Sequence, residues 1–215
     1  MTDQTLTHLY FLLDRSGSMQ TIKSDIEGGF AAFLAEQREA PGRCVVTLAQ
    51  FDDRYDVVHA GLDVADVPPL VLAPRGSTAL HDAMGRLVTD AGAELAALPE
   101  AERPGTVIVA VMTDGLENAS REWHAQAVKA LVEQQSATYG WQFLYMGADQ
   151  DAVEVGTSLG VPAEQSMTYA RGKGRQAMGA KSEKIRSMRA ARMTDAAAPM
   201  PAYTAAERRD LADPS

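Results

Sequence analysis

Short apolar runs alternate along this chain with segments of helical spacing, and this alternation constrains the fold more than any other feature. Runs of this length are typical of strands that are covered on both faces of a sheet. They lie at residues 9–13, 44–51, 106–112 and 141–146. Between them, an apolar residue recurs every three or four positions from Ile22 to Leu34, which predicts an amphipathic helix. Residues 79–98 and 120–133 predict two more helices.

This order of elements predicts an α/β fold. We expect a doubly wound, Rossmann-like, mainly parallel sheet with helices on both of its faces. A polar turn at residues 51–55 is followed at once by YDVVH at residues 55–59. That pattern predicts a hairpin, so one edge strand should be antiparallel.

The composition limits the class of protein. The 215 residues are 46% hydrophobic, which suits a folded domain and excludes a wholly disordered chain. The single cysteine, Cys44, excludes an intrachain disulfide and a multi-cysteine zinc site, and its apolar surroundings predict an inert core thiol. We find neither a signal-peptide pattern nor an apolar stretch of about 20 residues. We therefore expect a cytoplasmic protein that does not enter a membrane.

The charge is divided unevenly along the chain. The formal net charge is −9, but residues 171–192 hold eight Lys or Arg and one acidic residue, for a local charge of +7 that leaves −16 for the rest. The acidic body argues against nucleic-acid binding, and contact with nucleic acid through the +7 segment is the less favoured alternative for the extension. We predict two parts, a domain at residues 1–170 and, at residues 171–215, a basic helical extension with a flexible tail. Met178, Ile185 and Met188 form an apolar stripe, so we expect the extension to dock on the acidic body.

Polar side chains cluster where the predicted parallel strands end. Asp14, Ser16 and Ser18 follow the first strand, Asp114 follows the strand at residues 106–112, and Thr78 precedes a helix. Ligands of open α/β sheets bind at this edge. Two carboxylates and three hydroxyls are hard oxygen donors, which suit Mg²⁺ or Mn²⁺. The serines could instead cap a helix, but two neighbouring aspartates would repel each other without a cation or donors between them.

These five positions resemble the metal-ion-dependent adhesion site (MIDAS) of von Willebrand factor type A (VWA) domains. The resemblance covers residues 6–163, and phrases such as Gly147-Ala148-Asp149 look like a bacterial and phage subgroup. It implies that Ser16, Ser18 and Thr78 contact the metal, while Asp14 and Asp114 act largely through water. An Asp or Glu of a protein partner would fill the open coordination position. In bacterial members, partners can be ATPases, kinases or phosphatases.

Other polar residues near this edge have simpler interpretations. We assign Asp52 and Asp53 to the turn, and Asn118 and Ser120 to the cap of the following helix. Asp149 and Asp151 also follow a strand, and we interpret them as helix-capping residues.

An enzyme is the alternative to a binding module. A Mg²⁺-dependent phosphohydrolase could use Asp14 as nucleophile and Arg15 or Arg75 to hold phosphate. The sequence has no Gly-x-x-x-x-Gly-Lys loop and no evident Ser–His–Asp arrangement, so we assign no catalytic residue.

Overall fold

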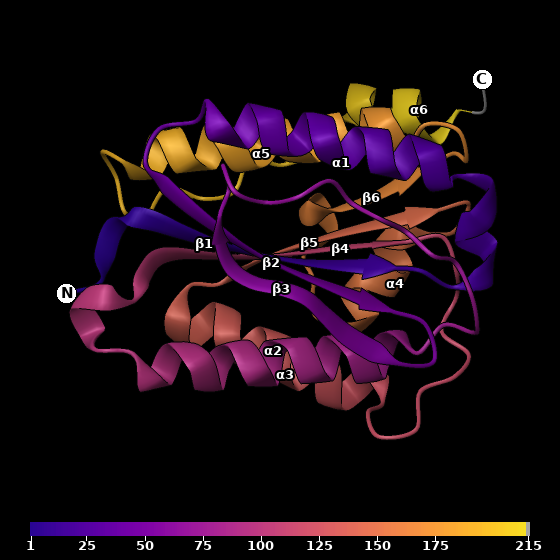
Figure 1. The fold of residues 1–215 in the computed structure, drawn as a ribbon, viewed down its shortest axis with the longest axis horizontal. Helices are drawn as coiled ribbons and strands as arrows, with labels where there is room; N and C mark the ends of the chain where they lie inside the picture. Colours follow the sequence, from indigo (N-terminus) through magenta and orange to yellow (C-terminus); the bar gives the residue numbers. More distant parts are fainter. Residues whose placement is uncertain (214–215) are drawn as a thin grey trace.

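A computed structural model describes residues 1–213 and shows one six-stranded sheet between two layers of helices (Figure 1). The strand order is β3–β2–β1–β4–β5–β6. Only β2 and β3 pair antiparallel among the described residues, and the other neighbours are parallel. The predicted doubly wound α/β fold and its antiparallel edge strand are therefore confirmed. The strands are β1 (Asp3–Asp14), β2 (Arg43–Phe51), β3 (Tyr55–Asp63), β4 (Pro104–Thr113), β5 (Gln142–Ala148) and β6 (Ser166–Tyr169).

The helices divide between the two faces of the sheet (Figure 1). Side chains alternate along β1, so Leu9, Phe11 and Leu13 belong to one buried core, and Tyr10 and Leu12 belong to the other. The first core is covered by α1 (Lys23–Arg38), α5 (Gly174–Arg192) and α6 (Ala205–Ala212). The second is covered by α2 (Leu80–Ala97), α3 (Ala125–Tyr139) and α4 (Ala152–Ser158). Three short 3-10 helices lie at Gly17–Thr21, Glu100–Glu102 and Ala163–Gln165.

The basic segment forms α5, which packs beside α1. Met178, Ile185 and Met188 are fully buried in the same core as Phe11, so the predicted docking of the apolar stripe is confirmed. A Cβ atom at Gly29 of α1 would lie 3.0 Å from Met178 Cγ, which shows how closely the two helices approach. The boundary predicted at residue 170 lies between β6 and α5, and the division into two parts stays a prediction. Residues 214–215, the end of the predicted tail, lie outside the described residues.

Two elements differ from the sequence expectation. The third helix begins at Ala125 and not at residue 120, because residues 117–123 bond to α2. The sixth strand, β6, was not predicted, since its four residues form no apolar run. Cys44 is buried, and burial raises the pKa of its thiol to about 11, as expected for an inert core residue. None of the helices described is long and apolar enough to cross a membrane.

The topology fixes where a ligand can bind. β1 is followed by α1 on one face of the sheet, while its neighbour β4 is followed by α3 on the other face. The loops that leave these two strands diverge and open a crevice at their carboxyl ends, which is the usual ligand position in such sheets. Asp14 ends β1 and Asp114 directly follows β4, so both carboxylates stand at this crevice.

Candidate metal centre

Hydrogen bonds link the loop after β1 to the loop after β4. Asp14 is fully buried, and its Oδ1 accepts a hydrogen bond from the main-chain N of Ser16 at 2.6 Å. The hydroxyl oxygens of Ser16 and Ser18 are 3.1 Å apart. Ser18 Oγ in turn donates to Asp114 Oδ1 at 2.5 Å. Four of the five predicted residues are therefore linked to one another by hydrogen bonds.

Thr78 reaches the same set from the loop before α2. A Cβ atom placed on Gly115 would lie 2.7 Å from Thr78 Oγ1 and 3.5 Å from Asp14 Oδ2, so the hydroxyl and the carboxylate face one glycine. The main chain of Thr78 is fixed by Asn118, whose Oδ1 accepts from Thr78 N and whose N donates to Thr78 O, both at 3.0 Å. The structure thus brings together all five predicted oxygen-bearing residues.

Burial disfavours the charged form of both carboxylates. Burial raises the pKa of Asp14 to about 6, although hydrogen bonds from Thr113 and Ser16 oppose the shift, and the nearby Asp114 carboxylate adds to it. Burial also raises the pKa of Asp114. Asp114 Oδ2 is buried and accepts no hydrogen bond from residues 1–213. A buried carboxylate oxygen without a hydrogen-bond donor favours a nearby positive charge, which a metal ion or the Arg171 guanidinium, with Nη2 3.3 Å away, can supply.

The donor set fits a hard divalent cation. Hydroxyl and carboxylate oxygens suit Mg²⁺ or Mn²⁺ better than softer metals. Within residues 1–213, no three His, Cys, Asp or Glu side chains are grouped to hold a metal, so a site here depends on the three hydroxyls. Ser16, Ser18 and Thr78 supply these hydroxyls.

Comparison with solved structures identifies the fold. The chain resembles the mussel byssus protein PTMP1 in a structure with a zinc-occupied MIDAS motif, with 15% identity, a TM-score of 0.60, and coverage of 84% of this chain and 46% of that one. It resembles the vWF domain of the type V pili tip protein Mfa5 from Porphyromonas gingivalis, with 11% identity, a TM-score of 0.60, and coverage of 84% and 95%. A third similar structure is the ArnB paralog VWA2 from Sulfolobus acidocaldarius, with 15% identity, a TM-score of 0.55, and coverage of 82% and 44%.

The chain has the VWA fold. It spans a little under half the length of PTMP1 and of the Sulfolobus protein. No match was found among protein-family models or among curated protein sequences. The metal of the PTMP1 structure is zinc, so the MIDAS motif of that protein accepts a divalent cation.

Asp52 fastens two loops of this VWA fold to each other. Its Oδ2 lies 2.9 Å from Arg15 Nε and 2.7 Å from Arg75 Nε. Burial alone would raise the pKa of Asp52, but the bonds from Arg75 and Arg15 outweigh it and lower the pKa to about 2. The side chain is fully buried, so Asp52 is an anchor between the loops that carry Ser16 and Thr78.

The residues predicted to cap α3 act elsewhere, so that prediction is wrong. Asn118 holds Thr78, and Ser120 Oγ accepts a hydrogen bond from Asp82 N at the start of α2. The cap of α3 is His124, whose Nδ1 accepts from Ala127 N. Asp151 does cap α4, as predicted, and accepts from the main chain of residues 153 and 154.

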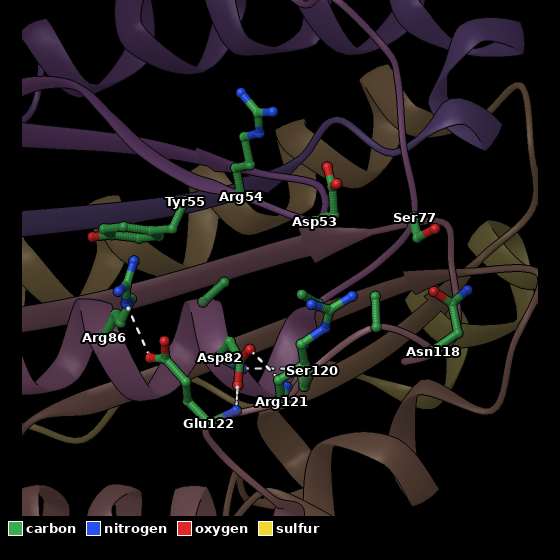
Figure 2. Close-up of a pocket in the computed structure, with 13 residues that line it drawn as sticks. Asp53, Arg54, Tyr55, Ser77, Asp82, Arg86, Asn118, Ser120, Arg121 and Glu122 are labelled. Carbon is green, nitrogen blue, oxygen red and sulfur yellow. Dashed lines mark hydrogen bonds and ion pairs between the residues drawn. The ribbon is translucent and has the colours of Figure 1, made fainter.

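A polar groove of about 570 Å³ lies beside the candidate metal centre (Figure 2). It is bounded by the β2–β3 turn, the start of α2 and residues 118–122. Ser77, which precedes Thr78, lies at the end of the groove nearest Asn118 in Figure 2.

Sequence reasoning missed one residue of the site, Arg171. Its Nη2 lies 3.3 Å from Asp114 Oδ2, and its Nε lies 3.1 Å from Asp149 Oδ2. Asp149, predicted to cap a helix, is instead an ion-pair partner of this arginine. Arg171 follows β6, and because β6 was not predicted, no signal placed this arginine at the ligand edge of the sheet.

Proposed function

We propose that this chain is a divalent-metal-dependent protein-binding module. The observation that carries the proposal is the convergence of three hydroxyls and two buried carboxylates on one crevice. Three neutral ligands leave a bound cation only partly neutralised, so it attracts a further anionic group. An Asp or Glu side chain of a partner protein supplies that group.

The partner belongs to a complex in the bacterial cytoplasm, and we expect Mg²⁺ or Mn²⁺ as the metal. ATPases, kinases and phosphatases are the classes to examine first. The polar groove beside Ser77 supports recognition of a polypeptide that extends beyond one acidic side chain.

Metal binding is the first test. We expect Thr78→Val to weaken the binding of Mn²⁺ and Mg²⁺ by about tenfold or more in calorimetric titrations, because it replaces the hydroxyl with a methyl group of similar size. In the described part of the chain, Thr78 bonds to Asn118 and Ala119 through its main chain, so the fold should tolerate the change. Ser77→Ala removes the neighbouring hydroxyl and is the matched control. Equal affinities in the two variants would contradict the proposed ligand set.

Partner capture is the second test. The wild-type protein should retain a partner in the presence of Mg²⁺ and lose it in chelator, and Asp14→Ala should lose it in both conditions. Retention of the same partners by Asp14→Ala in chelator would refute a metal-dependent module.

The alternative is a Mg²⁺-dependent phosphohydrolase. That function needs a cation free to hold phosphate, and the two arginines considered for it, Arg15 and Arg75, are both paired with Asp52. This pairing favours the binding module. Mg²⁺-dependent turnover of a generic phosphoester that Asp14→Asn abolishes would reverse the preference.

A further inference from the structure

Arg171 faces the same carboxylate that the metal would use. Its guanidinium touches Asp114 twice, with Nη2 3.3 Å from Oδ2 and 3.4 Å from the main-chain O. Its Nε contacts Asp149 Oδ2 at 3.1 Å. Asp114 Oδ2 has no hydrogen-bond donor within residues 1–213, so this guanidinium is the positive charge that lies against it.

The main chain holds Arg171 in this position. Arg171 N donates to Asp149 Oδ1 at 3.2 Å, and Ala170 N donates to the O of Leu211 in α6 at 2.8 Å. Asp149 has a φ of 49°, in the left-handed region that a residue with a side chain rarely adopts. Asp149 N also donates to Tyr169 O at 3.0 Å. These contacts hold Arg171, which lies between β6 and α5, against the loop that follows β5.

Two positive charges near one buried carboxylate oppose each other. Without metal, Arg171 offsets the charge of Asp114, whose side chain is fully buried. A divalent cation among Ser16, Ser18 and Thr78 would bring a second positive charge to the same carboxylate. Like charges at short range repel strongly where water is partly excluded.

We propose that Arg171 is a built-in cation that competes with the divalent metal for Asp114. It stabilises the metal-free protein and lowers the affinity for metal. This inference rests on the proposed metal-dependent function, because it assigns the residue that sets the affinity of the same site.

The test is a calorimetric titration of the full chain with Mn²⁺ and with Mg²⁺. We expect Arg171→Gln to bind both ions about tenfold more tightly than wild type, equivalent to about 1.4 kcal/mol. In chelator, the same variant should have a lower Tm, since Asp114 loses its counter-charge. Arg171→Lys keeps the charge but loses the Nε contact with Asp149, so its metal affinity should lie between those of wild type and Arg171→Gln. A residue with only a structural role would lower the Tm without tightening metal binding.

Arg175→Gln is the matched control. Arg175 is an exposed arginine at the start of α5, and its side chain pairs with Asp25 of α1 at 4.0 Å and not with a candidate ligand. It should leave metal affinity unchanged. If Arg171→Gln binds the metal ions with wild-type or weaker affinity, the proposed competition between Arg171 and the metal is refuted. Failure of every protein, wild type included, to bind Mn²⁺ or Mg²⁺ would instead refute the proposed metal site and this inference with it.

Discussion

Asp52 joins two arginines from two different loops through one buried carboxylate. Replacing it by asparagine would remove the buried carboxylate from Arg15 and Arg75, which would keep only their ion pairs with the exposed Asp56, and Arg15 is itself largely buried. Removing one partner of a buried ion pair commonly costs about 3 kcal/mol or more. We expect Asp52→Asn to lower the free energy of unfolding by about 3 kcal/mol, as measured by urea denaturation at pH 7.

The pH dependence provides a second readout of Asp52. Its pKa is lowered to about 2 in the folded protein, so the stability it contributes is present above its ordinary pKa of 3.8 and is lost as pH falls toward 2. The stability difference between wild type and Asp52→Asn should therefore shrink between about pH 4 and pH 2. Asp53→Asn alters the exposed neighbour and is the control. Equal stability of the two variants would contradict the anchoring role of Asp52.

At the scale of elements, the start of α2 is shaped by the loop that follows β4. Gly85 of α2 lies under Trp123, and a Cβ atom there would be 2.1 Å from the indole ring. Gly92, on the same helix, has only Gln135 Nε2 nearby, at 3.6 Å. An added methyl group would therefore clash with a side chain at Gly85 and would have space at Gly92.

Gly85→Ala should destabilise the protein by about 1 to 3 kcal/mol, because the ring has to move. Gly92→Ala should be neutral or stabilise it by about 0.5 to 1 kcal/mol, because alanine is the better helix former. Chemical denaturation of both variants measures this difference. The displaced loop also carries Asn118, so Gly85→Ala should weaken Mn²⁺ binding as well. Equal stability in both variants would show that Trp123 is not fixed against α2.

Elements with a strong pattern were predictable from sequence, and elements held by remote contacts were not. The strand at residues 106–112 and the helix face from Ile22 to Leu34 follow from local hydrophobic spacing. The loop at 117–123 carries residues typical of a helix cap, yet Asn118 bonds to Thr78 and Ser120 to the start of α2, about 40 positions earlier in the chain. Arg171 is 57 positions from Asp114, and only the pairing of β5 with β6 brings it to the site. The five candidate ligands were predictable because their order matched a known motif.

At the scale of the whole molecule, the +7 segment is held by apolar burial together with three buried basic side chains, Lys181, Lys184 and Arg189. Arg175 and Arg186 of α5 are exposed, whereas Met178, Ile185 and Met188 are fully buried against the sheet and α1. Burying a large apolar side chain stabilises a protein by about 2 kcal/mol, so three of them contribute about 6 kcal/mol. That contribution is comparable to the whole stability of a typical domain, about 5 to 15 kcal/mol.

Deleting residues 171–215 should therefore abolish cooperative unfolding and expose the face of the sheet that α5 covers, measured by thermal denaturation and by binding of a hydrophobic dye. The double substitution of Arg175 and Arg186 by glutamine removes two exposed charges and keeps the apolar contacts, so it should change stability by less than about 1 kcal/mol. A truncated chain that still unfolds cooperatively would show that residues 1–170 fold alone and that α5 is an appendage. If the truncated chain does not unfold cooperatively and the double variant keeps wild-type stability, α5 is part of the domain core. In that case Arg171 is held at the metal centre by the same packing that keeps the sheet covered.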